Sequence, residues 1–160
     1  MAKAKVVGFD LFLADIDRMG NRYEEATGRA IYEGARILAD TVKVELSFLP
    51  LEDGNAYGTD KKKMSGLKHP QKEGLMSSFG ITKMQHDGAM FDIKMGFDGY
   101  NNVRTSKFPN GQPNALIARS VESGTSFRQK NPFLTRAYKT AKSTSEKEMQ
   151  EVFEHYFEKR

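Results

Sequence analysis

The order of helix stops and starts between residues 113 and 134 constrains the fold of this 160-residue chain more than any other feature. Pro113 and Asn114 offer the start of a short helix, and Gly124 stands where the end of a helix favours a left-handed residue. Asn131 is suited to cap a second helix, with Pro132 at its first position, where no N–H is needed. The sequence therefore predicts a short helix, a turn and a long C-terminal helix in succession.

The N-terminal part of the chain is also predicted to be helical. Apolar residues recur at helical spacing from about residue 11 to 48, and we place the helix at about Arg22 to Phe48. Gly34 and Ala35 lie inside it and are small enough to let another element pack closely.

The last helix is predicted to run from Pro132 to near Glu158. Residues 143–145 form a weak point in it, because they are Ser and Thr. Ser145 and Glu148 have the spacing of a capping box, so this helix could kink or restart there.

Between the helices, two strands are predicted at 74–84 and 89–97. Asp87-Gly88 between them has the chemistry of a tight hairpin turn. In the second strand Phe91, Ile93 and Phe97 alternate with polar residues and should face a helix. We therefore expect one α+β domain over residues 1–160: a long N-terminal helix, an antiparallel β-sheet with a central hairpin, a short helix, and a long C-terminal helix packed on the sheet.

Two irregular segments, at about 49–73 and 98–113, are too long for simple connections and are predicted to contact neighbouring molecules. The basic run Lys61-Lys62-Lys63 in the first segment is predicted to be an exposed loop tip. Three aromatic residues complete the candidate interface, two of them in the second segment and one at the C-terminal end of the last helix. The candidate interface residues are Lys61, Lys62, Lys63, Tyr100, Phe108 and Phe157.

Composition excludes several classes of protein. The absence of cysteine removes disulfides and thiolate metal sites, and no apolar run reaches membrane-spanning length or forms a signal peptide. The 25 basic and 21 acidic residues give a formal charge of +4 and are interleaved along most of the chain. This interleaving favours a mixed solvated surface over a single basic face.

The sequence offers little from which to build an active site. His69, His86 and His155 are far apart, and none has a partner at a metal-ligand spacing. The segment from Ser123 to Ser126 lacks the pattern of a phosphate-binding loop, so local hydrogen bonds of Thr125 and Ser126 in a turn are the favoured interpretation. We expect no enzyme activity, no catalytic residue, no metal and no cofactor.

Two motifs in the chain resemble a known family. The stretch from Ala118 to Thr125 followed by Pro132-Phe133-Leu134-Thr135-Arg136-Ala137 is similar to A-x-x-V-E-x-G-T followed by P-F-L-x-x-A. The stretch from His69 to Phe79 is similar to A-P-x-x-T-G-x-L-x-x-S-I, with His69 in place of Ala and Glu73 in place of Thr. Both patterns, together with a helical N-terminal segment, are those of the phage tail-completion or neck proteins typified by the tenth gene product of phage HK97.

This resemblance implies a structural role. It suggests a head–tail joining subunit that forms a ring around the DNA channel, through which genomic DNA passes without sequence-specific binding. Its partners would be other copies of itself and tail-terminator or head-connector proteins, and no membrane would be involved. The location would be the head–tail junction of the virion, and the host cytoplasm during assembly. Glu122 matches a recurrent acidic residue, and we expect it either to be solvated or to pair with a basic group on this or a neighbouring subunit. The other motif positions expected to be structural are Pro70, Gly74, Gly124, Thr125, Pro132, Phe133 and Leu134. A small basic nucleic-acid-binding protein is the alternative.

Overall fold

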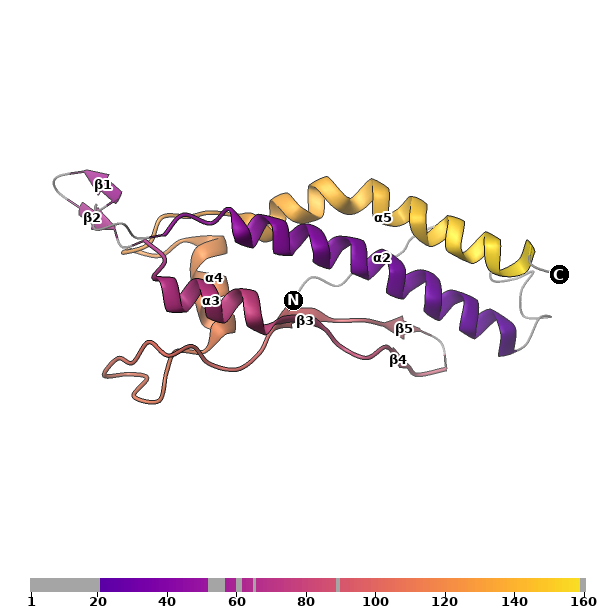
Figure 1. Ribbon diagram of the computed structural model, residues 1–160, viewed down its shortest axis with the longest axis horizontal. Coiled ribbons are helices and arrows are strands. Elements are labelled where there is room, and N and C mark those ends of the chain that lie inside the picture. Colours follow the sequence, from indigo (N-terminus) through magenta and orange to yellow (C-terminus); the bar gives the residue numbers. More distant parts are fainter. Residues whose placement is uncertain (1–20, 52–56, 60–61, 65, 89, 159–160) are drawn as a thin grey trace. The chain divides into compact units, whose positions relative to one another are not determined.

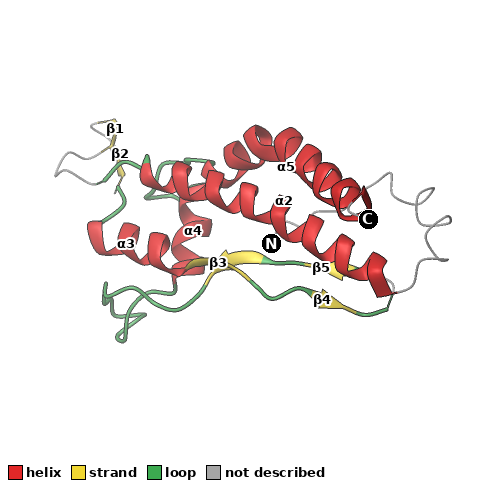
Figure 2. Ribbon diagram, turned by 45° about the vertical axis from the view of Figure 1, so that its right-hand side comes forward, coloured by secondary structure: helices red, strands yellow, loops and turns green. Residues whose placement is uncertain are grey.

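The computed structural model describes residues 21–51, 57–59, 62–64, 66–88 and 90–158. It is a mixed α+β structure with four helices and short paired strands in this part of the chain (Figure 1). The elements, in chain order, are α2 (Asn21–Ser47), β1 (Tyr57–Thr59), β2 (Lys62–Met64), α3 (His69–Ser78), β3 (Phe79–Ile81), β4 (Gln85–His86), β5 (Phe91–Asp92), β6 (Met95–Phe97), α4 (Asn114–Ser123) and α5 (Phe133–Glu158). The strands pair as β1–β2, β3–β6 and β4–β5 (Figure 2). The predicted fold class is confirmed.

The chain divides into two compact units. Unit 1 comprises residues 1–37, 81–95 and 142–160, and unit 2 comprises residues 38–80 and 96–141. Helices α2 and α5 each contribute one part to each unit. The N-terminal helix matches its prediction to within one residue at each end. Its fully or almost fully buried apolar positions are Ala26, Ala30, Ala39, Val42 and Leu46.

In unit 1, α2 and α5 lie side by side (Figures 1 and 2). Ala26, Ala30 and Phe153 form their buried core, and the ring of Tyr23 meets that of Phe153 edge-on at 5.7 Å. The helix does not restart near Ser145, because α5 continues without a break from residue 133 to 158. The Ser145 side chain is buried and bonded to α2 instead of capping a new helix.

A two-stranded ribbon completes unit 1. Strands β4 and β5 pair antiparallel, with Gln85 opposite Asp92 and His86 opposite Phe91. The Asp87-Gly88 turn is confirmed: the Asp87 carboxylate accepts the N–H of residue 90 at 3.0 Å, and Gly88 has φ of 89°.

The predicted strand at 74–84 is wrong in its first half. Residues 74–78 are the end of helix α3, and the strand is limited to β3. Gln71 and Leu75, one helical turn apart, are buried on one face of α3, and Gln71 also accepts the N–H of Lys68 at 3.0 Å at the helix start. The predicted strand at 89–97 is present only as two short pieces, β5 and β6.

In unit 2, Phe79 of β3 and Phe97 of β6 pack near the start of α5. Phe133 is fully buried, and its ring lies 6.2 Å from that of Phe97, which in turn lies 5.0 Å from Phe79. Phe97 therefore faces a helix as predicted. The ring of Phe91 instead stacks on that of His86, with ring centroids 4.2 Å apart.

The two segments predicted to be irregular differ from one another. The first contains the antiparallel pair β1–β2, and α3 already begins at His69, so its assignment as an irregular segment over about 49–73 is wrong. The second folds back on itself without a helix or named strand (Figure 1). Tyr100 forms an antiparallel bridge with Pro113, and the backbone N–H of Asn101 donates to the carbonyl of Gln112 at 2.9 Å. None of the described helices is long and apolar enough to cross a membrane.

Candidate functional site

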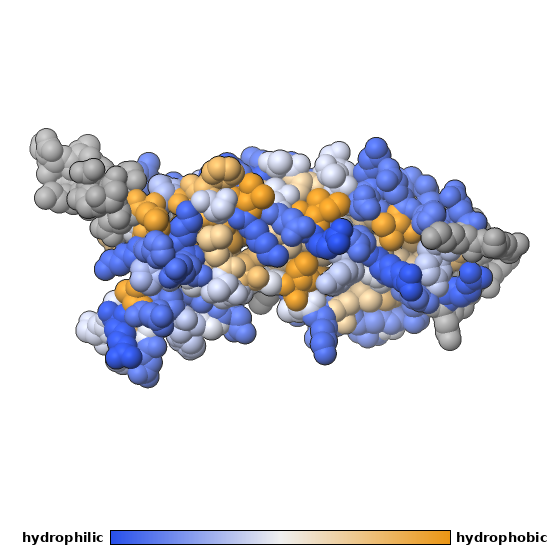
Figure 3. Space-filling view, in the orientation of Figure 1, coloured by the Kyte–Doolittle hydropathy of each residue, from blue (hydrophilic) through white to orange (hydrophobic). Residues whose placement is uncertain are grey.

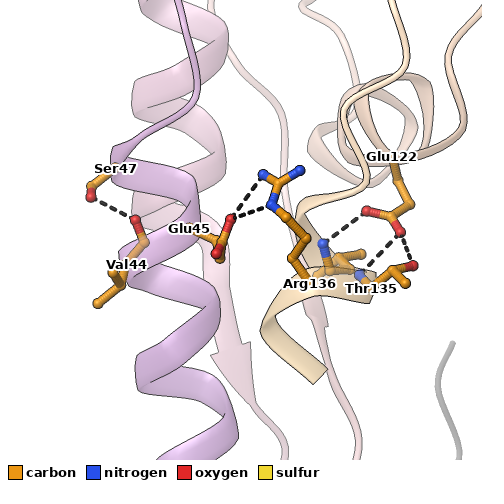
Figure 4. A network of polar contacts seen from close by, with 7 residues as sticks. Val44, Glu45, Ser47, Glu122, Thr135 and Arg136 are labelled. Atoms are coloured by element: carbon orange, nitrogen blue, oxygen red, sulfur yellow. Dashed lines mark hydrogen bonds and ion pairs between the residues drawn. The ribbon is translucent and has the colours of Figure 1, made fainter. Parts of the chain in front are cut away.

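The junction of α4 and α5 brings the first motif together in space. The Glu122 carboxylate, near the end of α4, accepts the backbone N–H of Leu134 at 2.8 Å and of Thr135 at 3.1 Å (Figure 4). It also accepts the Thr135 hydroxyl at 2.5 Å. The first N–H groups of a helix have no partner within the helix, and a negative charge is favourable there. Glu122 therefore caps α5 from the preceding helix.

This geometry corrects two predictions. Asn131 does not cap α5 with its side chain, and its Oδ1 is buried with no hydrogen-bond partner in the described part of the chain. Its backbone N–H instead donates to the carbonyl of Val121 at 2.8 Å, which fixes the turn against α4. Among the described residues of this chain Glu122 pairs with no basic side chain, and its half-buried carboxylate is not simply solvated, because it accepts the backbone N–H groups of α5.

The turn between α4 and α5 depends on Gly124 and Thr125. Gly124 ends α4 with φ of 72°, as predicted, and a Cβ built there would lie 3.0 Å from the backbone nitrogen of Lys130. The Thr125 hydroxyl accepts the N–H of Arg128 at 3.0 Å, and the Thr125 N–H donates to the Arg128 carbonyl at 2.9 Å. The predicted local hydrogen bonding of Thr125 is thus confirmed.

The second motif, residues 69–79, contacts the N-terminal end of α4. A Cβ on Gly74 would lie 2.5 Å from Oδ1 of Asn114, so only glycine allows this approach of α3 to the first residue of α4. Asn114 is buried, and its side-chain amide donates to the Asp98 carbonyl at 2.9 Å. Pro70 lies in the first turn of α3 and is exposed.

Three polar contacts in unit 2 were not predicted. Buried Gln71 accepts a hydrogen bond from Arg128 at 3.2 Å and donates one to Gln112 at 2.7 Å. Arg136 forms an ion pair with Glu45 at 2.8 Å (Figure 4). These partners are 41 to 91 residues apart, and spacing in one sequence carries no signal for such pairs.

A further unpredicted contact lies at the end of helix α2. The Lys72 ammonium donates to the carbonyls of Ser47 at 2.7 Å and Leu49 at 2.8 Å. The last carbonyls of a helix lack partners and carry partial negative charge, so a cation is favourable there. Lys72 thus fixes α3 to the end of α2 within unit 2.

The candidate interface residues are scattered. Tyr100 is 69% exposed, and Phe108 is half-buried beneath the Lys107 ammonium, 5.7 Å from the ring centre. Phe157 packs against Phe153 in unit 1, with ring centres 5.1 Å apart. Lys61 lies outside the described residues, and Lys62 and Lys63 lie in β2, where only the backbone is described.

A carboxylate and a phenol are coupled in unit 1. The Tyr156 hydroxyl donates to Glu25 at 2.8 Å, and Arg29 forms an ion pair with the same carboxylate at 2.6 Å. The hydrogen bond from Tyr156, followed by the charge of Arg29, lowers the pKa of Glu25 from its ordinary value. The same hydrogen bond raises the pKa of Tyr156.

The surface offers modest concave features. In unit 2 a pocket has a floor of Leu49, Leu67 and Val121 and a polar side that includes Arg128 and Lys130. No group of three or more His, Asp or Glu residues that could hold a metal occurs in the described ranges. The face drawn in Figure 3 mixes hydrophilic residues with smaller apolar patches.

Comparison with protein-family models, curated proteins and solved structures found no match to this chain.

Proposed function

We propose that this protein is a structural subunit of the phage head–tail junction, a tail-completion or neck protein. In this role it oligomerises into a ring around the DNA channel and joins the tail to the capsid connector. Its partners are other copies of itself and tail-terminator or head-connector proteins. Its location is the head–tail junction of the virion, after assembly in the host cytoplasm.

The observation that carries this proposal is the capping of α5 by Glu122. The acidic residue of one matched segment binds the backbone of Leu134 in the other at 2.8 Å. Gly74 of the upstream motif lies directly against Asn114, at the start of the helix that carries Glu122. The residues that carry the family resemblance therefore interact as one structural unit, which favours a shared fold over a coincidence of short patterns.

Two segments are available for assembly. A head-to-tail ring needs two different and complementary patches on each subunit. The β1–β2 pair forms a sheet of its own, and the segment 98–113 folds back on itself. The buried aromatic residues described in unit 2, Phe79 and Phe133, lie outside both segments, so each segment can change without removing them.

The proposal is tested by shortening the segment between Gly54 and Lys63. Because β1 and β2 pair with each other and with no other described strand, we expect the variant to retain its circular dichroism spectrum and melting temperature. It should fail to form rings in electron micrographs and fail to join heads to tails. A control with Lys142→Ala and Lys147→Ala, on the solvated side of α5, should assemble normally.

Each outcome decides a different point. Normal joining by the folded deletion variant would exclude this segment as the interface, and an unfolded variant would place it in the core. If the unaltered protein remains monomeric, alone and with neck proteins, the head–tail role is wrong. The alternative, a small basic nucleic-acid-binding protein, would then be supported by tight binding to free DNA that weakens steeply with salt.

A further inference from the structure

The charges of this chain are unevenly distributed over its second half. Residues 99–145 contain eight basic side chains and a single acidic one, Glu122. The carboxylate of Glu122 is occupied by the backbone of α5. The rest of the chain therefore carries a net negative formal charge, although the whole protein is at +4.

Most of these cations belong to unit 2 and are exposed. Arg136 pairs with Glu45, Lys142 pairs with Glu146 in unit 1, and Arg128 is buried. The remaining five have no ion pair with a carboxylate of the described residues, namely Arg104, Lys107, Arg119, Lys130 and Lys139. Cations without nearby carboxylates are available to an anionic partner.

Four of these cations are exposed in parts of unit 2 that follow one another along the chain. Arg104 and Lys107 lie in the folded-back segment 98–113, which leads directly into α4, and Arg119 lies on the exposed side of that helix. Lys130 lies against Gly124 at the end of α4. A ten-residue helix is about 15 Å long, so α4 spans several phosphate spacings of a DNA strand.

The segment 98–113 is held in shape by its own hydrogen bonds. Thr105 and Phe108 exchange backbone hydrogen bonds of 3.1 and 3.0 Å, and the Asn101 side chain accepts the N–H of Val103 at 2.9 Å. A Cβ on Gly111, with φ of 110°, would overlap the carbonyl oxygen of Asn101. Because the loop is ordered before any contact, little conformational entropy is lost on binding.

The exposed groups on this segment suit a phosphate backbone. Asn102, Thr105, Ser106 and Asn110 are exposed beside the two cations, and hydrophilic residues cover most of this loop in Figure 3. Arg, Lys, Ser, Thr and Asn side chains are those that contact DNA phosphates without reading sequence. No carboxylate lies in the segment beyond Asp98 to repel them.

We propose that the folded-back segment and α4 form a surface that binds the phosphate backbone of duplex DNA without sequence preference. This proposal deepens the proposed function. It rests on that function only in taking the phage DNA in the channel as the duplex that is bound. In a neck subunit, this surface faces the DNA channel, and weak reversible contacts hold the duplex while it passes.

The test is a salt titration of binding to a short fluorescein-labelled duplex, followed by fluorescence anisotropy. The variants are a loop pair, Arg104→Ala with Lys107→Ala, and a helix pair, Arg119→Ala with Lys130→Ala. The control pair, Lys142→Ala with Lys147→Ala, removes the same formal charge from positions that already face Glu146 and Glu151. Circular dichroism of each variant verifies that it is folded.

We expect the slope of log Kobs against log salt to become shallower by about 0.9 for each cation that no longer neutralises a phosphate, so by about 1.8 in each of the first two variants. The control should keep the slope of the unaltered protein. A salt-independent affinity, or an equal change of slope in the control, would overturn the inference. The change of slope measured with a second duplex of unrelated sequence should be the same, and a strong sequence preference would also contradict the inference.

A negative result for DNA binding can be distinguished from a failure of the proposed head–tail function. The DNA titration uses the purified protein and does not depend on ring formation or joining. A protein that assembles into particles but does not bind the duplex would retain the head–tail role and lose this surface.

Discussion

The hydroxyl of Ser145 in α5 donates a 2.8 Å hydrogen bond to the backbone carbonyl of Gly34 in α2. The absence of a side chain at Gly34 makes this contact possible, because a Cβ there would overlap Cγ of Met149 and lie 3.0 Å from Oγ of Ser145. The two helices of unit 1 are therefore held at a close approach by one small residue and one buried hydroxyl.

We expect Gly34→Ala to destabilise the protein. Alanine is favoured over glycine in a helix by about 1 kcal/mol, but overpacking against Met149 costs about 1–3 kcal/mol. Gly28→Ala in the same helix is the matched control, because its Cβ would meet only the end of the exposed Met84 side chain. Urea unfolding should give a lower free energy for Gly34→Ala and an unchanged or higher one for Gly28→Ala. Equal effects would contradict the close contact.

Removal of the Glu122 carboxylate should weaken the start of α5. Glu122→Ala leaves the N–H groups of Leu134 and Thr135 without their acceptor, so we expect a loss of about 1–2 kcal/mol in the free energy of unfolding. Glu122→Gln keeps one acceptor oxygen but no charge and should lose less. Glu146→Ala, an exposed position in α5, is the control and should change the free energy by less than about 0.5 kcal/mol. A loss in the control as large as that of Glu122→Ala would show that the cap contributes little.

The left-handed residue at the end of α4 predicts a strong effect of Gly124→Val. A β-branched residue is strained at φ of 72°, and its Cβ would also meet Lys130 at 3.0 Å. We expect a loss of about 1–3 kcal/mol, seen as a lower melting temperature. Gly80→Val is the control, since no atom lies within 4 Å of a Cβ there and the residue is exposed. An unchanged melting temperature for Gly124→Val would contradict the assigned helix end.

The hydrogen bond between Tyr156 and Glu25 predicts a change in titration. Because the folded-state pKa of Glu25 is lowered, its stabilising contribution is present above the ordinary pKa of 4.5 and is lost as the pH falls through the lowered value. Tyr156→Phe removes the main cause, so the pKa of Glu25 should rise toward its ordinary value while Arg29 still lowers it in part. An NMR titration of the Glu25 carboxyl carbon measures this, with Tyr32→Phe as control. An unchanged pKa would show that the hydrogen bond is absent in solution.

The sequence predicted those features that depend on neighbouring residues. The ends of α2 and α4, the Asp87-Gly88 turn and the positive φ of Gly124 all follow from local chemistry within a few positions. The helix at Gly74 to Ser78 was missed because its apolar face is short and is stabilised by the burial of Gln71, a polar residue. Hydrophobic patterns cannot reveal a buried glutamine whose partners are Arg128 and Gln112.

The candidate site shows the same limit. The motif residues around Glu122 were identified, yet the cap was assigned to Asn131, which is adjacent to the helix in sequence. Folding brought a residue from the preceding helix to the same amides. Tertiary contacts decide between two acceptors of similar chemistry, and local spacing favours only the nearer one.

The two caps at Glu122 and Lys72 have opposite consequences during synthesis on the ribosome. Glu122 precedes the helix that it caps, so the acceptor for the first turn of α5 already exists when that turn emerges. Lys72 follows Ser47 by 25 residues, and at about 5–20 residues per second the end of α2 waits roughly 1–5 seconds for its cation. We therefore expect the nascent chain to form its last helix with its N-terminal cap already present, and the C-terminal end of its first long helix to lack its cation until α3 has been made.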